Sequence, residues 1–469
     1  MSAERNRAEM KWWGWGSPYE SYALPERAAS LLRSEVGLGQ QRRPAVGLEQ
    51  VRLREPALPG GLRDRLQAAA GADNVRDDRR ARILHAAGKG YVDLVRQRSG
   101  QCEQAPDAVV APESHRAVQA VLAACADAGV AVVPFGGGTS VVGGVEPVRG
   151  EFPAVIALDL GRLDALVSID EGSLVAVFEP GLRGPEAEGL LARRGLTLGH
   201  FPQSFRYATL GGFAATRSVG QASTGYGRFD ELVKGLRCAA PAGDVALATV
   251  PASAAGPSMR ELIVGSEGTL GVITQLALRV RPRPRFRRYE GWMFASFADG
   301  IEALRRLEQQ GVAPEAARLS DEEESRVSSA LAGDGVKQRA GRLYLRARGF
   351  ATGCLFIGGW EGGKDTVRLR HAHGARLLRR AGGLPVGRGP GAAWERSRFA
   401  APHLRDELLE RGVMVDTLET ATTWSNLLAL HAAVVDALHR ALARRGTPPL
   451  IMCHVSHLYP TGASLYFTF

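Results

Sequence analysis

The sequence predicts an α+β protein with more than one domain. A chain of 469 residues is longer than one hydrophobic core usually serves, and 45% hydrophobic with 23% charged residues is typical of globular proteins. A short buried strand, an amphipathic helix and a second strand over residues 107–144 indicate a βαβ-type unit. Strands mixed with long Arg-, Ala- and Leu-rich helices over residues 285–450 indicate a second α+β domain.

Residues 1–104 are predicted to form an irregular, partly helical lead-in. Its most unusual feature is KWWGWG at residues 11–16, whose three tryptophans lie between glycines and cannot share one face of a regular helix. We interpret this stretch as a packed arm that covers a hydrophobic core, with a ligand contact as the alternative.

Residues 105–284 carry the clearest alternation of strands and helices. Ser114 is a typical N-cap, and Gly129 a typical stop, for the helix between them. The other expected elements are a strand at 107–112, a strand from 130 that enters a glycine-rich loop ending at 144, strands at 153–160 and 173–181, a helix near 185–194, and a strand region at 270–284. The prolines that end this region place a domain boundary near residue 284.

Residues 285–450 combine a strand at 353–362 with helices at 366–383 and 426–446. We expect the charge run of the first helix to be a solvated face. The last segment, residues 451–469, is rich in β-branched and aromatic residues and predicts a strand with a turn.

Composition and charge argue against several classes of protein. The net charge is +10, but no zinc-finger spacing, aromatic RNA-binding signature or basic-zipper pattern accompanies it, so nucleic-acid binding is not expected. The five cysteines are odd in number and form no CxxC motif, which favours a reducing compartment. The sequence shows neither a secretory signal nor a run of ~18–20 apolar residues that would span a membrane. We therefore predict a cytoplasmic protein whose basic surface suits peripheral contact with anionic lipid.

Three glycine-rich loops, each joined to a strand, indicate an anion-binding site. PFGGGTS at 134–140 offers consecutive backbone N–H groups that can curl around an anion. QSFRYATLGGFAATRSVG at 203–220 and GSEGTLGVI at 265–273 add further glycines beside Thr, Ser and Arg. The set suggests one large polyphosphate cofactor gripped along its length, and three independent tight turns are the alternative.

The order and wording of these loops resemble the FAD-binding domain of the vanillyl-alcohol-oxidase/PCMH superfamily. The resemblance is closer still to the alkyldihydroxyacetonephosphate synthase family, and it covers nearly the whole chain. The stretches that carry it further are MKWWGWG at 10–16, GHFPQS at 199–204, APEAARLSD at 313–321, ETATTW at 419–424 and TGASLYFTF at 461–469. It implies a two-subdomain PCMH-type FAD-binding domain at 105–284, a substrate-binding α+β cap at 285–450, and a strand at 451–469 that returns toward the flavin.

The resemblance also implies roles for particular residues. Tyr466, His200 and Arg318 would be catalytic, and Arg405 would contact the substrate, in particular its phosphate. The FAD site would consist of Pro134, Phe135, Gly136, Gly137, Gly138, Thr139, Ser140, Gln203, Ser204, Thr209, Gly211, Gly212, Thr216, Arg217, Ser218, Glu267, Gly268, Thr269, Leu270, Gly271, Val272 and Ile273. Considered without the resemblance, His200 and Arg318 would be interpreted as buried polar residues satisfied by their neighbours.

The implied reaction exchanges the acyl chain of acyl-dihydroxyacetone phosphate for a long-chain fatty alcohol, with no net redox change. It needs a proton shuttle beside the ketone, which a tyrosine near histidine or flavin can provide. It also needs a fixed cation for the phosphate, where arginine offers bidentate geometry. FAD would be held without a covalent bond, and the protein would suit a homodimer.

Two other interpretations stay open. An FAD-dependent D-2-hydroxyacid dehydrogenase shares the flavin domain but carries an HVGxGNxH-like metal site, whereas this chain has HVSHLYPTGASLYF at 454–467. His454 and His457 would ligate a metal only from a helix, and their surroundings predict a strand, so no metal is expected. The second is a non-catalytic lipid-binding relative that contacts anionic lipid through its basic segments.

One departure from the family concerns histidines. Synthases of this family carry a histidine-rich loop, HHH, after the terminal strand, and this sequence contains no HHH. The chain as written is therefore expected to be a truncated form with little or no turnover.

Overall fold

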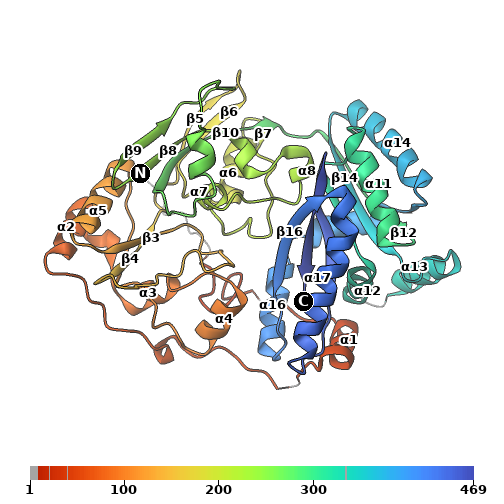
Figure 1. Cartoon of the computed structure of the whole chain (residues 1–469), viewed down its shortest axis with the longest axis horizontal. Helices are drawn as coiled ribbons and strands as arrows, with labels where there is room; N and C mark the ends of the chain where they lie inside the picture. The colour runs from red at the N-terminus through yellow and green to blue at the C-terminus, as the bar shows by residue number, and fades with distance from the viewer. Residues whose placement is uncertain (1–8, 21, 40, 333–334) are drawn as a thin grey trace. The chain divides into compact units, whose positions relative to one another are not determined.

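The computed structural model describes residues 9–20, 22–39, 41–332 and 335–469, the last without the side chain of Lys337 (Figure 1). The chain divides into two compact units. Unit 1 takes its described residues from 1–20, 44–220 and 227–283, and unit 2 takes its own from 21–43, 221–226 and 284–469. Two short segments of the first half of the chain thus belong to the second unit.

Unit 1 begins with a four-stranded sheet in the order β1-β2-β4-β3, whose strands are β1 (Val75–Arg76), β2 (Ala108–Val110), β4 (Val155–Asp159) and β3 (Ala131–Phe135). β2 and β3 both pair with β4 in parallel. α5 (His115–Asp127) connects β2 to β3, and the Ser114 hydroxyl caps it by accepting a hydrogen bond from Ala117 N at 3.1 Å. The predicted βαβ-type unit is confirmed.

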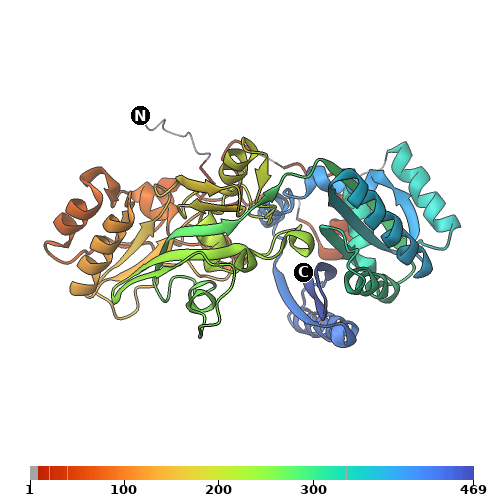
Figure 2. The same cartoon turned by 90° about the horizontal axis from the view of Figure 1, so that it is seen from above.

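The second sheet of unit 1 is antiparallel and has the order β5-β6-β10-β8-β9. Its strands are β5 (Leu166–Asp170), β6 (Val175–Phe178), β8 (Val233–Ala240), β9 (Gly243–Leu247) and β10 (Val272–Arg279). The buried side chains of Phe178, Phe213 and Leu276 join this sheet to α6 (Gly184–Ala192) and α7 (Leu210–Ala215) in one core. Figures 1 and 2 show both sheets of unit 1 in orange to green.

The remaining elements of unit 1 are short and lie around these sheets. They are η1 (Leu48–Gln50), α2 (Leu62–Ala70), η2 (Ala72–Asn74), α3 (Arg79–Leu84), α4 (Tyr91–Arg98), β7 (Leu196–Thr197), α9 (Phe229–Leu232), α10 (Met259–Ile263) and β11 (Arg281–Pro282). Trp12 and Trp15 of the tryptophan-rich stretch are buried, and Trp12 packs with Val51 and Ile83 in a small core. The expectation of a packed arm is confirmed at these two positions.

Unit 2 is built on a seven-stranded antiparallel sheet in the order β15-β12-β14-β13-β17-β18-β16. The strands are β12 (Phe286–Phe294), β13 (Ala316–Ser320), β14 (Cys354–Gly362), β15 (Leu384–Gly387), β16 (Thr417–Thr423), β17 (Met452–Tyr459) and β18 (Gly462–Thr468). Its helices are α1 (Glu26–Val36), α8 (Ser223–Tyr226), α11 (Phe297–Gln309), α12 (Glu322–Leu331), α13 (Val336–Ala347), α14 (Lys364–Arg380), α15 (Arg388–Ser397), α16 (Ala401–Glu410), η3 (Trp424–Asn426) and α17 (Leu427–Ala443). The terminal segment is therefore a two-stranded hairpin inside a larger sheet.

The two faces of this sheet differ in chemistry. Leu319, Val455 and Leu465 lie in the largest apolar core of the unit, together with side chains from α11 and α14. Because side chains alternate along a strand, their neighbours Arg318, His454 and Tyr466 lie on the opposite face. One sheet face is thus apolar packing and the other carries polar groups.

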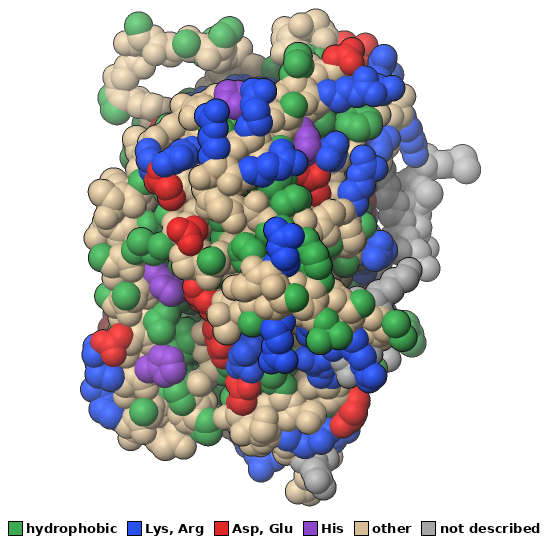
Figure 3. Space-filling model, turned by 90° about the vertical axis from the view of Figure 1, so that its right-hand side faces the viewer, with side chains coloured by type: hydrophobic (Ala, Val, Ile, Leu, Met, Phe, Trp, Pro, Cys, Tyr) green, Lys and Arg blue, Asp and Glu red, His purple; other side chains and the backbone are tan. Residues whose placement is uncertain are grey.

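The outer surface of α14 is basic. Lys364, Arg368, Arg376, Arg379 and Arg380 are exposed, as a solvated face requires. On the face shown in Figure 3, Lys and Arg side chains predominate over Asp and Glu.

Candidate functional site

The three glycine-rich loops come together in unit 1. A methyl group added at Gly137 would lie 2.1 Å from the carbonyl oxygen of Tyr207, and one at Gly136 would lie 2.5 Å from Thr209 Oγ1. One at Gly268 would lie 2.9 Å from Pro134 Cγ. The first loop therefore packs directly against the second and third loops, and glycine permits these backbone approaches.

The backbone of these loops is locally unusual. Gly138 has φ +63°, and the non-glycine residues Arg217 and Glu267 have φ values of 48° and 49°. Left-handed conformations of such residues cost energy and are often found at functional sites. Arg217 Nε donates to Val264 O at 2.9 Å and its Nη2 donates to Glu261 O at 2.6 Å, so this side chain ties the second loop to the segment before the third.

The second loop runs into α7. Thr209 is the N-cap of this helix, and its Oγ1 accepts a hydrogen bond from Gly212 N at 3.2 Å. Gly211 packs against Pro180, where an added methyl group would lie 2.6 Å from its Cβ. The predicted glycine pair is thus fixed by a cap and by close packing.

Several features of the loops suit a bound dinucleotide. Gln203 Oε1 is buried and has no hydrogen-bond partner among the residues that the structure describes. Val142, which follows the first loop, is 75% exposed, and Leu270 of the third loop is 52% exposed. Glycine amides, an unpaired buried acceptor and exposed apolar side chains together fit an FAD with a charged pyrophosphate and a flat ring.

His200 is buried beside the second loop. Its Nε2 lies 3.0 Å from Ser218 Oγ, and its ring contacts Phe213 and Phe229 with centroid distances of 4.8 and 4.9 Å. The structure therefore brings His200 together with Ser218, another of the predicted residues.

A buried carboxylate that sequence reasoning missed anchors the turn before His200. Glu188 on α6 accepts hydrogen bonds from Thr197 Oγ1 at 2.7 Å and from Leu198 N and Gly199 N at 3.0 Å each. Burial raises the pKa of Glu188, and the three hydrogen bonds oppose that rise. Its only sequence signal is a second acidic residue, after Glu186, in a short helix whose remaining residues are small or apolar.

The other predicted residues lie in unit 2. Arg318 on β13 and Tyr466 on β18 lie on the polar face of the sheet. Arg405 on α16 is 9% exposed, and its Nη1 lies 3.9 Å from Asp416 Oδ1. Burial raises the pKa of Tyr466, while a hydrogen bond with Thr417 and the charges of Arg405 and Arg318 oppose the rise, so the phenol is protonated at neutral pH.

His454 lies between Arg318 and Tyr466. His454 is opposite Tyr466 in the β17–β18 pairing, and the two rings stack with centroids 5.0 Å apart. Its Nε2 lies 3.0 Å from Arg318 Nη1. The sequence pattern indicated His454 only as a possible metal ligand and gave no signal for Glu324, whose Oε1 accepts from Arg318 Nη2 at 2.5 Å.

The charges of this cluster depend on one another. Burial alone would raise the pKa of Glu324, but the charge of Arg318 and the contact with His454 outweigh it and lower that pKa to about 2. Burial, reinforced by the charge of Arg318, lowers the pKa of His454 and keeps its imidazole neutral. The cluster therefore contains one carboxylate, one guanidinium and one neutral imidazole.

His454 and His457 lie on β17, as the prediction of a strand requires. A different group, Asp321, His431 and Cys453, brings its ligand atoms within 4.8 Å of one another. His431 Nε2 lies 3.2 Å from Asp321 Oδ2, and the other Asp321 oxygen caps α12 by accepting from Glu324 N at 2.8 Å. Contacts with His431 and with Glu324 N therefore satisfy both oxygens of the Asp321 carboxylate without a metal ion.

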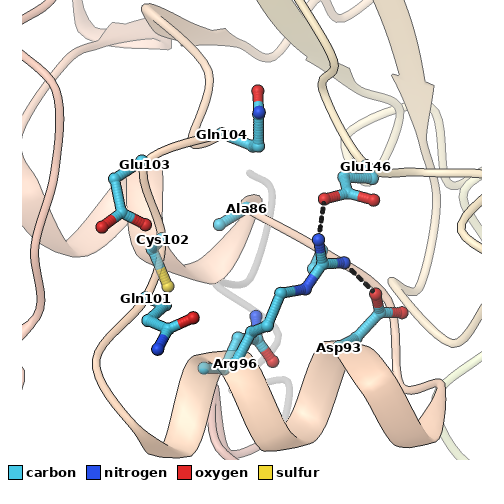
Figure 4. A pocket seen from close by; sticks show the side chains of 10 residues that line it. Ala86, Asp93, Arg96, Gln101, Cys102, Glu103, Gln104 and Glu146 are labelled. Atoms are coloured by element: carbon cyan, nitrogen blue, oxygen red, sulfur yellow. Dashed lines mark hydrogen bonds and ion pairs between the residues drawn. The ribbon is translucent and has the colours of Figure 1, made fainter.

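Unit 1 also contains a small cavity of about 170 Å³ (Figure 4). Arg96 enters it from α4 and forms ion pairs with Glu146 at 2.9 Å and Asp93 at 3.0 Å. Because two carboxylates already neutralise this arginine, the cavity is a poor match for an anionic substrate.

Fold and loops define the class of this protein: it is an FAD-binding flavoprotein with a second domain of the FAD-linked oxidase type. Residues 106–248 match the FAD binding domain family, and residues 283–469 match the family of FAD linked oxidases, C-terminal domain. The chain is 34% identical to alkyldihydroxyacetonephosphate synthase of Dictyostelium discoideum over 435 residues, which cover 91% of this chain and 71% of the relative. It is 33% identical to the same enzyme of Trypanosoma brucei brucei over 427 residues, or 89% of this chain and 70% of the relative.

The fold agrees with these matches. A solved alkyldihydroxyacetonephosphate synthase structure superposes with a TM-score of 0.87 and 31% identity, covering 98% of this chain and 90% of that chain. The chain belongs to the alkyldihydroxyacetonephosphate synthase family, and it is an FAD-dependent enzyme of that family. Among the described residues, no helix combines the length and the apolar composition needed to cross a membrane.

Proposed function

We propose that this enzyme exchanges the acyl chain of acyl-dihydroxyacetone phosphate for a long-chain fatty alcohol and thereby forms the ether bond of ether lipids. The observation that carries the proposal is the match to alkyldihydroxyacetonephosphate synthases along nine-tenths of the chain. The site geometry supports it, because FAD-type loops occur in the same chain as a tyrosine and two arginines suited to a phosphorylated ketone.

The three loops of unit 1 would hold the cofactor. Backbone N–H groups of residues 134–140 would surround the pyrophosphate, and Gln203 would supply an acceptor to FAD. Thr216, Arg217 and Ser218 would line the flavin together with residues 267–273, beside His200. When bound, FAD supplies the electron-poor flavin ring at which the substrate carbon reacts. No side chain is proposed to attach to it covalently.

Residues of unit 2 would handle the substrate. Tyr466, held as a neutral phenol by burial, can give and take the proton on the carbon beside the ketone. Arg405 and Arg318 are permanent cations, and a phosphate dianion needs such partners when it leaves water. In this assignment Arg405 holds the phosphate, and Arg318 acts near the reacting carbon.

The test supplies acyl-dihydroxyacetone phosphate and labelled hexadecanol to the purified protein. Label in an ether product, with release of one fatty acid per ether formed, is the expected result. In a parallel assay D-lactate and a dye acceptor test the D-2-hydroxyacid dehydrogenase alternative. Dye reduction without labelled ether would reject the proposal, and failure to bind FAD would favour the non-catalytic lipid-binding alternative.

Three variants test the residue roles. Tyr466→Phe removes one hydroxyl and should lower kcat by about 10²–10⁴-fold, the usual contribution of a positioned acid or base. Arg405→Lys should mainly raise KM for the phosphorylated substrate, because lysine cannot form the bidentate contact. Arg318→Lys should mainly lower kcat. Equal effects of the two arginine variants on KM would contradict the division of roles.

Peripheral membrane contact is also proposed, through the exposed basic residues of α14. Both substrates carry long alkyl chains, so an enzyme at the lipid surface would meet them there. We expect the protein to be cytoplasmic and to co-sediment with vesicles that contain 30% anionic lipid more than with neutral vesicles. A homodimer is the expected assembly, and sedimentation velocity measures it.

A further inference from the structure

The polar face of the unit 2 sheet places one histidine in contact with two proposed catalytic residues. Ser320 of β13 pairs with His454 of β17, and His454 pairs with Tyr466 of β18. Arg318, two residues before Ser320, lies on the same face. These side chains come from three adjacent strands, and α12 adds Glu324 beside them.

The hydrogen-bonding pattern of this cluster admits one protonation state. A guanidinium only donates, so His454 Nε2, 3.0 Å from Arg318 Nη1, must accept. A neutral imidazole has one N–H, which must then be on Nδ1. That atom lies 3.1 Å from Glu324 Oε2, an ion-pair distance at which the two groups are not aligned for a full hydrogen bond. The carboxylate thus faces a donor on each of its oxygens.

Exposure separates an inner pair, His454 and Glu324, from the more exposed Arg318. The side chains of His454 and Glu324 are 8% and 10% exposed, whereas that of Arg318 is 26% exposed. Two N–H groups of Arg318 point to the buried pair, at Nη1 and Nη2. The rest of its guanidinium remains available to a ligand.

We propose that His454 and Glu324 are positioning residues that fix the guanidinium of Arg318 and the ring of Tyr466 for the exchange reaction. His454 does so with its two surfaces: the ring edge accepts from Arg318, and the ring face stacks on Tyr466. Glu324 holds the opposite side of Arg318 and sets the tautomer of His454. This inference rests on the proposed function, which gives Arg318 and Tyr466 their roles.

Two substitutions of His454 separate its two contacts. His454→Phe keeps a ring for Tyr466 but removes the acceptor for Arg318. His454→Gln loses the ring but places an amide oxygen at about the reach of Nε2. We expect kcat of His454→Phe to fall by about 10–100-fold, the effect of a displacement near 1 Å, with KM changed less than about threefold. His454→Gln should recover the part of that loss that is due to Arg318, and the part that remains should reflect the lost ring contact with Tyr466.

A third variant tests the tautomer argument and serves if His454→Phe does not fold. Glu324 accepts a hydrogen bond from Arg318 and faces His454 Nδ1 with its other oxygen, but the amide of Glu324→Gln accepts at only one atom. A donor would then face a donor at one of the two contacts. We expect a loss of kcat of about tenfold or more, because Arg318 is again displaced.

The matched control is a second buried histidine–glutamate pair in unit 2. His371 Nε2 lies 2.6 Å from Glu290 Oε1, and the His371 ring contacts Trp360 edge-on. This pair lies at the apolar core and contacts none of the proposed catalytic residues. His371→Phe should lower the melting temperature but leave kcat per bound FAD unchanged.

The experiment measures kcat, KM, bound FAD and melting temperature for wild type and the four variants, with crystal structures of both His454 variants. Displacement of Arg318 in His454→Phe, but not in His454→Gln, supports the inference. It is overturned if Arg318 keeps its place in His454→Phe, if both His454 variants lose kcat equally, or if His371→Phe loses as much. Absence of exchange activity in wild type would reject the proposed function alone, since the position of Arg318 still decides this inference.

Discussion

Substitution of Gly137 by alanine tests whether the close approach of the loops holds the cofactor. The added Cβ would lie 2.1 Å from Tyr207 O and 2.8 Å from both Tyr207 C and Ala208 Cα. All three neighbours are backbone atoms, so no rotamer change can relieve the contact. The two loops must therefore move apart.

The size of the effect follows from that overlap. Inserting a methyl group into well-packed structure typically costs about 1–3 kcal/mol. If this strain is relieved by separation of the loops that hold FAD, each 1.4 kcal/mol lowers affinity about tenfold. We therefore expect Gly137→Ala to weaken FAD binding by about 5- to 150-fold.

Gly189 provides the matched control in the same unit. It lies inside α6, and a methyl group added there has no neighbour within 4 Å. Alanine is favoured over glycine in a helix by about 1 kcal/mol, so Gly189→Ala should leave FAD binding unchanged and raise the melting temperature slightly.

The assay removes FAD, titrates it back and follows the flavin fluorescence of wild type and both variants. Wild-type affinity in Gly137→Ala would refute the reasoning, because it would show that the observed approach is not needed for binding. An equal loss of FAD affinity in Gly189→Ala would also refute it, since the effect would then reflect a general destabilisation of unit 1 and not the contact between the loops.

Three further predictions concern stability. Glu188→Ala should destabilise unit 1 by about 2–4 kcal/mol, because the Leu198 N–H and the Thr197 hydroxyl lose their buried acceptor and the Gly199 N–H keeps only Thr197 Oγ1. Chemical denaturation should show a smaller loss for Glu188→Gln. The pKa of Glu324 is lowered from 4.5 to about 2 on folding, which contributes about 3 kcal/mol to the free energy of unfolding. This contribution should be complete above pH 5 and should be lost as the pH falls through 2. If the stability of Glu324→Gln falls as steeply with acid as that of wild type, the sign of this effect is wrong. Trp360→Ala should cost about 3–5 kcal/mol, because this fully buried ring fills the unit 2 core and its Nε1–H donates to Val312 O. Urea unfolding with an unchanged midpoint would count against that packing.

Local signals explain what the sequence could predict. Ser114 caps α5 as its side-chain chemistry requires, the first glycine-rich loop follows β3, and the third leads into β10, as the sequence indicated. The terminal residues form strands, as their β-branched and aromatic content predicted. Each of these conclusions depends on residues a few positions apart.

Long-range pairing explains what the sequence could not predict. β13 lies between β14 and β17, which brings Arg318 within 3.0 Å of a histidine 136 positions later. Periodicity fixes which residues share a face but not which strands become neighbours. For the same reason no local pattern indicated that residues 21–43 and 221–226 belong to unit 2.

The cluster of Arg318, Glu324 and His454 on the polar face of the unit 2 sheet is difficult to explain by its contribution to folding stability. Removing the Glu324 carboxylate from water costs several kcal/mol, which the attraction of Arg318 must first offset. Apolar side chains at Glu324 and His454 would fill the same space without that penalty, as Leu319 and Val455 do on the other face. What the ionic arrangement adds is direction, because it holds one guanidinium at two defined points and one imidazole in a single tautomer. A sheet face that orients two side chains, although an apolar face would be more stable, is expected where those side chains act on a substrate.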